Sequence, residues 1–359
     1  MTASNPVVIR ELELPVSVGA AGWVDFATAM SIHFGNEALS YGTDELAFTA
    51  AEALPGYLDQ EHEPTRLFVA RDGKRMIGVG RYEVEPGDDP RTAWLMVDVL
   101  PGVRGAGVGT ALSAKLNGIA ATDGIRKAIV YAVSPYGPGE RLVAPTGFGS
   151  LPRDNAEVRF LLSKGYRLEQ VVRGSRLALP TDVAQKCTAT LATAGSDFAV
   201  HNWVDSTPPR WREEMAALRQ LMSTEEPNAG LDEPEDVWTV ERLLEDEDRQ
   251  TASPRTRLFS VIEHVPSRTL AGFTTLSVPA EVDRTVSQED TLVRREHRGH
   301  RLGMLLKLAN LVQLHKRMPG HPAVITFNAE ENRHMLDVNE SVGFVPIGYE
   351  GAWRRDLPT

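Results

Sequence analysis

An arginine followed by closely spaced glycines occurs twice in the sequence. The first copy, LPGVRGAGVGTAL, covers residues 100–112, and the second, LVRREHRGHRLGMLL, covers residues 292–306. Amide N–H groups at the start of a helix have no acceptor within the helix, and the helix dipole adds about half a positive charge there. Because glycines also let the chain curl around a ligand, the pattern predicts an anion site, and its repetition predicts two.

Two other phosphate-binding motifs fit these residues less well. A P-loop needs a Lys and a Ser or Thr after its last glycine, and no Lys follows Gly107 or Gly109. A dinucleotide fingerprint needs GxGxxG after a buried parallel strand, whereas GAGVG has another spacing and Pro101 lies where that strand would end. The sequence therefore favours a different kind of anion site.

Each turn must be positioned by a strand before it and a helix after it, and apolar periodicity predicts both. In the first half we expect strands at 7–12, 66–71, 76–83, 92–99 and 127–132, with a helical stretch at 23–53. In the second half we expect strands at 198–204, 257–263, 269–278, 290–293 and 323–327, with a helical stretch at 211–244. This is a mixed α/β plan built twice.

A second repeat supports the division into halves. NAEVRFLLSKGY at 155–166 matches NRHMLDVNESVGF at 332–344, which predicts a final helix in each half. Only the first half has the Gly- and Pro-rich stretch 134–152, which predicts an inserted loop. The segment 177–195 is poor in large apolar residues, so we place the joint there, between domains 1–180 and 196–359.

The two turns and the closing segments resemble the GNAT superfamily of acetyl-CoA-dependent N-acetyltransferases. The resemblance covers both halves, so the chain looks like a tandem GNAT protein with a splayed mixed α/β sheet in each domain. It implies that pantetheine pairs with the strand before the turn and that the turn's amides hold the pyrophosphate of acetyl-CoA. The matching positions are Val99, Arg104, Gly105, Gly107 and Gly109, and Leu292, Val293, Arg298, Gly299, His300, Arg301, Leu302, Gly303 and Asn332.

The sequence departs from the family at two places. Arg301 replaces the middle glycine of the second turn, where a side chain resists the backbone conformation. The family often uses a Tyr of the final helix to protonate the leaving thiolate, and the matching positions are Leu161 and Asn339. Leu161 offers no polar group, whereas Asn339 either donates a hydrogen bond or is a buried core residue.

Acetyl transfer to an amine also needs a base, because an alkyl amine with a pKa of about 10.4 is almost entirely protonated at pH 7. In the family this is often a carboxylate of the strand before the turn. The candidates are Glu289 and Asp290, which strand alternation places on opposite faces, and Asp98 in the first half.

We therefore expect Glu289, Asp290 and Asn339 to be the catalytic residues. The second half would then be the active domain, with an oxyanion-binding amide near Val293. The first half would bind coenzyme in a structural role, and its inserted loop would close the acceptor side.

The charge of the chain indicates which classes of molecule it binds. The chain has 38 basic and 49 acidic side chains, a net charge of −11, which disfavours nucleic-acid binding. Residues 225–249 hold eleven carboxylates and two arginines. We expect this acidic segment either to attract a small cationic amine on the acceptor side or to form a solvated helix face.

Other features exclude further classes. No stretch approaches the roughly 18–20 apolar residues of a membrane span, and the first residues lack a secretory pattern. Cys187 is the single cysteine, which favours the reducing cytoplasm. His297 and His300 have no evident third ligand, so no metal site is predicted.

Two rival functions stay open on sequence grounds. The missing Tyr in both halves suits a non-catalytic acetyl-CoA sensor, which would bind coenzyme without turnover. A nucleotide-dependent oxidoreductase is the other rival, and it would bind NAD in place of acetyl-CoA.

Overall fold

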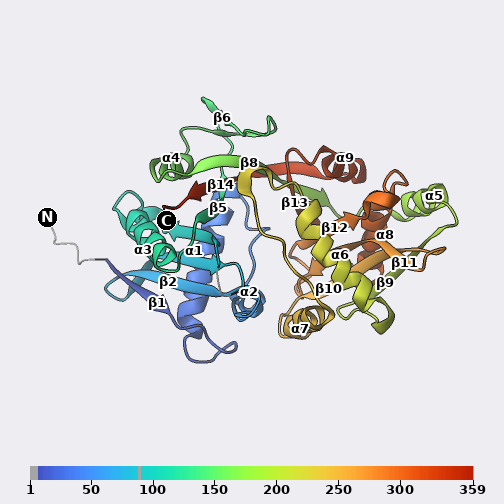
Figure 1. The fold of residues 1–359 in the computed structure, drawn as a ribbon, viewed down its shortest axis with the longest axis horizontal. Coiled ribbons are helices and arrows are strands. Elements are labelled where there is room, and N and C mark those ends of the chain that lie inside the picture. Colours follow the sequence, from blue (N-terminus) through green and yellow to red (C-terminus); the bar gives the residue numbers. More distant parts are fainter. Residues whose placement is uncertain (1–6, 88–89, 359) are drawn as a thin grey trace. The chain divides into compact units, whose positions relative to one another are not determined.

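The strands and helices of the computed structural model follow the predicted α/β plan, and the structure describes residues 7–87 and 90–358 (Figure 1). Two compact units divide the chain. Unit 1 contains residues 1–171, 229–234 and 348–359, and unit 2 contains residues 172–228 and 235–347.

Unit 1 has the strand order β1-β2-β3-β4-β5-β14, in which β4 and β5 are parallel and their other neighbours antiparallel. Its elements are β1 (Val8–Leu12), α1 (Trp23–Tyr41), α2 (Ala50–Tyr57), β2 (Thr65–Asp72), β3 (Arg75–Val84), β4 (Thr92–Val99), η1 (Pro101–Val103), α3 (Val108–Thr122), β5 (Lys127–Ser134), β6 (Arg141–Val143), β7 (Ser150–Pro152), α4 (Ala156–Ser163) and most of β14 (Val345–Asp356).

Unit 2 has the strand order β8-β13-β12-β11-β10-β9, with β12 and β13 parallel. Its elements are most of β8 (Arg167–Ala178), α5 (Ala184–Ala194), β9 (Phe198–Val204), η2 (Pro209–Trp211), α6 (Arg212–Glu225), α7 (Val240–Gln250), β10 (Thr256–His264), β11 (Thr269–Val278), β12 (Val286–Val293), η4 (Arg295–His297), α8 (Leu302–Arg317), β13 (Ala323–Ala329) and α9 (Arg333–Val342). The short turn η3 (Ala229–Leu231) belongs to unit 1.

Helices cover both faces of each set of strands, because alternate strand residues point to opposite sides. In unit 1, Leu67 and Val69 of β2 pack with α1 and α2, while Phe68 and Ala70 pack with α3. In unit 2, Phe259 of β10 packs with α6 and Leu258 with α8. Each turn therefore lies between a strand and a helix that share a buried core.

The closing strands are exchanged between the halves of the sequence. Residues 349–356 of β14, at the end of the chain, pair with β5 in unit 1. Residues 172–178 of β8, which close the first half of the sequence, pair with β13 in unit 2. The predicted domains 1–180 and 196–359 follow the sequence repeat, and the compact units differ from them by this exchange and by residues 229–234.

Four predicted segments differ in detail from the structure. Each helical stretch is two helices: Gly42 ends α1 in a left-handed conformation, and a capping box at Thr49 starts α2. The predicted joint contains the end of β8 and the helix α5, and the insertion 134–152 contains the hairpin of β6 and β7.

Among the described residues, no helix combines the length and the apolar character that crossing a membrane requires.

Candidate coenzyme turns and acceptor residues

The first turn, residues 100–107, joins β4 to α3. Gly105 and Gly107 have φ angles of 79° and 87°, in the left-handed region that favours glycine. A Cβ atom at either position would meet no heavy atom within 4 Å, so the backbone conformation explains these glycines, not close packing. Gly107 is the N-cap of α3 and offers no side-chain cap, which leaves the first amides of the helix available to an anion.

The second turn, residues 294–301, repeats this geometry between β12 and α8. Gly299 has a φ of 89°, and Arg301 occupies the N-cap position with a φ of 59° and a ψ of 23°. The backbone therefore takes the left-handed conformation although a side chain is present, at a cost of about 1–2 kcal/mol.

The parallel strands beside each turn separate before they reach it. β4 pairs with β5 at residues 92–94 only, and β12 pairs with β13 at residues 286 and 287 only, among the described residues. Beyond these pairs, the backbone of β4 and β12 that leads to the turn keeps a partner on one side only. This is the splayed arrangement that the sequence predicts.

The arginine side chains of the two turns make the same Nε hydrogen bond, but their Nη2 atoms have different partners. Arg104 Nε donates to Val99 O and Arg298 Nε donates to Val293 O, both at 3.1 Å. Arg104 Nη2 then donates to the neutral Asn36 Oδ1 at 2.9 Å, whereas Arg298 Nη2 donates to Glu225 Oε2 at 2.7 Å.

Glu225 brings a negative charge to the arginines of the second turn. Its side chain is 8% exposed, and it accepts hydrogen bonds from both Arg298 and Arg295. Although burial opposes ionisation, the two arginines hold its pKa below the ordinary value. The second turn therefore contains an internal anion, whereas Arg104 of the first turn contacts the neutral Asn36 in the same way.

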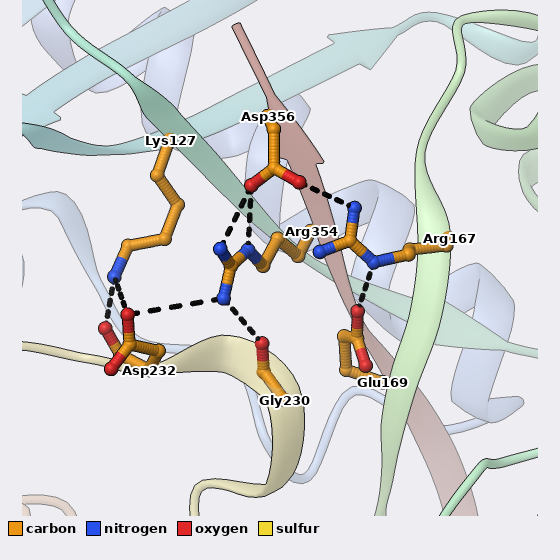
Figure 2. Close-up of polar contacts among 7 residues, drawn as sticks. All are labelled: Lys127, Arg167, Glu169, Gly230, Asp232, Arg354 and Asp356. Atoms are coloured by element: carbon orange, nitrogen blue, oxygen red, sulfur yellow. Dashed lines mark hydrogen bonds and ion pairs between the residues drawn. The ribbon is translucent and has the colours of Figure 1, made fainter.

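Several other carboxylates of the acidic segment also have partners. Figure 2 shows Asp232 beside Lys127 and Arg354 within unit 1, while Arg354 Nη1 donates to Gly230 O at 2.8 Å. The same view shows Asp356 between Arg354 and Arg167.

Elsewhere in the segment, Glu233 accepts from Trp94 Nε1 at 2.8 Å within unit 1, and Asp246 pairs with Arg257 in unit 2. These contacts account for several of the segment's carboxylates.

The catalytic candidates of β12 lie at a β-bulge. Thr274 pairs with Thr291 and Leu276 pairs with Gln288, which leaves Glu289 and Asp290 together opposite one residue of β11. This bulge interrupts the simple alternation on which the expected separation of the two side chains rests, and the charges of both carboxylates raise the pKa of Arg257.

The environments of these two carboxyl groups differ. Burial raises the pKa of Glu289, although the positive charge of Arg257 opposes this. Asp290 Oδ2 accepts from Arg219 Nη1 at 3.2 Å, and the Arg219 guanidinium lies 5.1 Å from the ring of Trp238. Glu289 is thus the better proton acceptor of the pair.

The remaining candidates of unit 2 have structural contacts. Asn332 caps α9, where its Oδ1 accepts from Met335 N at 3.3 Å. Asn339 is 1% exposed, and its Nδ2 donates to Asn328 Oδ1 at 2.7 Å. His300 packs against the ring of Phe198, and Leu302 is buried at the start of α8.

The structure reveals a group of ionisable residues in unit 1, of which the sequence had indicated Asp98 alone. His33, Glu37 and Tyr41 recur every four residues on one face of α1. Asp98 of β4 contacts His33, and Glu350 of β14 accepts a hydrogen bond from the Tyr41 hydroxyl. The helical spacing of the first three was a usable signal, but the contribution of β14 was not visible in the sequence.

Burial is the main influence on the pKa of Glu350. It raises the pKa of this carboxyl to about 7, although the Tyr41 hydrogen bond acts in the opposite direction. Glu37 also has a raised pKa because of burial. The group can therefore exchange protons near neutral pH. By contrast, Leu161 of α4 lies in the apolar core, so this position offers no acid.

Comparison with known proteins supports the resemblance to the GNAT family. Residues 37–139, which include β4, the first turn and α3, match the Acetyltransferase (GNAT) family. Over these residues the chain is similar to the GNAT family. The predicted resemblance and the acetyltransferase assignment are confirmed at this level.

Solved GNAT structures share the fold over almost the whole chain. A tandem GNAT protein from the clavulanic acid biosynthesis pathway, solved without AcCoA, is 21% identical with a TM-score of 0.70, and the match covers 98% of this chain and 100% of that one. A GCN5-related N-acetyltransferase from Sphaerobacter thermophilus is 16% identical with a TM-score of 0.60, covering 98% and 96%. The tandem GNAT fold predicted from the sequence is confirmed.

A third structure adds a different context. The GCN5-related glucosamine N-acetyltransferase region of a fungal multi-domain GH3 beta-N-acetylglucosaminidase is 15% identical with a TM-score of 0.63, and the match covers 99% of this chain and 38% of that one. No curated protein matches the sequence.

Proposed function

We propose that this GNAT protein transfers the acetyl group of acetyl-CoA directly to a primary amine of a small cationic molecule. The observation that carries the proposal is the arginine and glycine turn at the open end of a splayed parallel strand pair. Arg104, the left-handed Gly105 and Gly107 and the uncapped start of α3 form a donor set suited to a diphosphate.

The strand before the turn supplies the other half of the coenzyme site. The edge of β4 that separates from β5 suits an extended pantetheine chain, which can pair with the backbone near Val99. The same roles are proposed for Leu292, Val293 and residues 298–303 in the second half, with Glu289 as the base there. The sequence predicts that the second half is the active one, whereas the groups around the first turn favour the first half.

The proposed preference for a cationic acceptor is supported by carboxyl groups of unit 1. Glu37, Asp98 and Glu350 place three carboxyl groups around α1 and β4. A diamine can leave one ammonium near a carboxylate while its other nitrogen reacts, so we expect charge attraction to lower KM.

The test is a binding and turnover experiment with the full chain. Coenzyme A, titrated calorimetrically, should give binding heat and raise the melting temperature. Acetyl-CoA with a panel of diamines, polyamines, amino sugars and amino acids should release free thiol in proportion to acetylated product. Binding without turnover would favour the sensor, and binding of NAD in place of coenzyme A would favour the oxidoreductase.

The preference for a cationic acceptor is tested by comparing two amines of different charge. Cadaverine and n-pentylamine have the same carbon chain, and they differ by one ammonium group. We expect kcat/KM for cadaverine to be higher and to fall more steeply with salt. Equal salt dependence for the two amines would contradict the cationic-acceptor proposal. A cytoplasmic location is proposed as well, supported by the single Cys187.

A further inference from the structure

His33 and Asp98 form a hydrogen-bonded pair beside the first turn. His33 Nδ1 lies 2.8 Å from Asp98 Oδ2, and the side chains are 18% and 17% exposed. An ionised carboxylate only accepts hydrogen bonds, so Nδ1 carries the hydrogen and Nε2 is the free basic nitrogen of the neutral ring. The pair therefore fixes both the tautomer and the orientation of the imidazole.

The other side of Asp98 connects this pair to the coenzyme turn. Asn36 Nδ2 donates to Asp98 Oδ1 at 2.9 Å and to Val99 O at 3.2 Å. Arg104 Nη2 donates to Asn36 Oδ1 at 2.9 Å. A continuous series of hydrogen bonds thus runs from the imidazole to the arginine proposed to bind the pyrophosphate.

The Nε2 atom faces a second carboxylate without being committed to it. Glu37 Oε1 lies 3.7 Å from His33 Nε2, beyond the hydrogen-bonding range of about 2.7–3.2 Å. No hydrogen bond to this nitrogen is seen among the described residues. An amine nitrogen between the two groups would donate to both of them.

The geometry points to His33 as the catalytic base of the first half, with Asp98 as its positioning residue. The inference rests on the proposed acetyl transfer and assigns its proton acceptor. His33 Nε2 takes one proton from the acceptor's ammonium group, which frees the nitrogen lone pair to attack the acetyl carbonyl.

The remaining steps balance without another reactant. The carbon–sulfur bond breaks, the thiolate of coenzyme A leaves, and the second nitrogen proton passes to that sulfur. The products are the amide, free coenzyme A and an imidazolium, which releases its proton to solvent.

Several charged groups face the imidazole and set its pH response. Burial lowers the pKa of His33, but the hydrogen bond and charge of Asp98 and the charge of Glu37 outweigh it, and the net pKa is raised despite Arg81 of β3. Glu350 of β14 adds a further ionisable group next to Glu37. Because the base must be neutral, activity should rise with pH through a value above the ordinary 6.5 or so.

The decisive experiment compares full-length variants in the amine panel assay. His33→Gln should lower kcat/KM by about 100-fold or more, the usual contribution of a general base. The Kd for coenzyme A should stay within about twofold, because His33 does not belong to the turn. Asp98→Asn should lower kcat and move the rising limb of the kcat/KM profile to lower pH, since the carboxylate favours the imidazolium.

A matched control uses another histidine paired with a carboxylate. His201 Nε2 lies 2.8 Å from Glu263 Oε2 in unit 2, so His201→Gln makes the same chemical change away from the first turn. Its kcat/KM should equal that of the wild type. Glu350→Gln removes the other group that titrates near neutrality, and it should move the rising limb of the kcat/KM profile less than Asp98→Asn does.

The outcomes separate this inference from the proposed function. If the wild-type protein acetylates an amine and His33→Gln retains full activity, the inference is wrong while the function stands. If Asp98→Asn leaves the rising limb of the kcat/KM profile at the same pH, the inference is also wrong, even when the variant is less stable than the wild type. If the wild type binds coenzyme A but acetylates no amine, both fail.

Discussion

The two turns have similar backbone conformations but differ in the charge of the groups around their arginines. Both place an arginine whose Nε donates to the carbonyl of the preceding valine, and both start a helix without a side-chain cap. In the first turn the guanidinium meets the neutral Asn36, and in the second it meets the carboxylate of Glu225. A repeated motif therefore specifies a shape, while residues from other elements decide how strongly that shape attracts an anion.

The acceptor residues differ in the same way. In unit 1 the proposed base comes from α1 and is held by a carboxylate of β4. In unit 2 the carboxylates lie in β12 itself, at a bulge, next to Arg219 and Arg257. The difference leads us to expect the reaction in the first half, although the sequence alone favours the second.

The largest expected effect on kcat/KM comes from a carboxylate placed at the start of α3. The same change at the start of α8 is the comparison. Neither Gly109 nor Gly303 has a positive φ, and a Cβ atom would meet only ordinary contacts at Gly109 and none at Gly303. We expect Gly109→Glu to lower kcat/KM by about 100-fold, because like charges ~4 Å apart repel by up to about 4 kcal/mol near a protein surface. Gly303→Glu should change it little.

Neutral variants of the same size serve as controls for this pair. Gly109→Gln and Gly303→Gln separate the effect of charge from that of bulk. The assay is thiol release from acetyl-CoA with the preferred amine. A large loss with Gly303→Glu alone would place the reaction in the second half.

A smaller effect should follow from the partners of the arginines. Arg104→Ala should weaken coenzyme A binding about tenfold, since a hydrogen bond to a charged group contributes roughly 1.5–3 kcal/mol. Arg298→Ala should weaken it less, and Glu225→Gln should strengthen binding at the second turn by removing the internal anion.

Calorimetry that resolves both sites gives the affinities. Glu235→Gln, which changes a carboxylate bonded to Gln220, provides the matched control for Glu225→Gln. Equal losses for Arg104→Ala and Arg298→Ala would show that Glu225 does not distinguish the turns.

The smallest expected effect concerns the backbone of the two turns. Arg301→Gly should raise the free energy of unfolding by about 1 kcal/mol, because glycine adopts the left-handed conformation without strain. Gly107→Ala should lower it by a similar amount at the first turn. Thermal unfolding should show melting temperatures shifted in opposite directions by about 2–4 °C. A destabilising Arg301→Gly would mean that the arginine side chain contributes more than its backbone costs.

Much of the fold and the outline of the site could be predicted from local patterns. Alternation predicted the strand Thr92–Val99 to its last residue, and the glycine spacing placed the turns and the helices after them. The bulge at Glu289 and Asp290 could not be predicted, because it depends on the register with β11. The linkage of His33 to Asp98 spans 65 residues and leaves no local signal.

The amino-acid sequence by itself determined the tandem plan and the two arginine and glycine turns, since helical periodicity and the freedom of glycine act within a few residues. Only the tertiary structure decided which groups surround each turn. Glu225 reaches Arg298 from the end of α6, and the last strand brings Glu350 to Tyr41, because packing joins segments whose separation in the chain no spacing rule records.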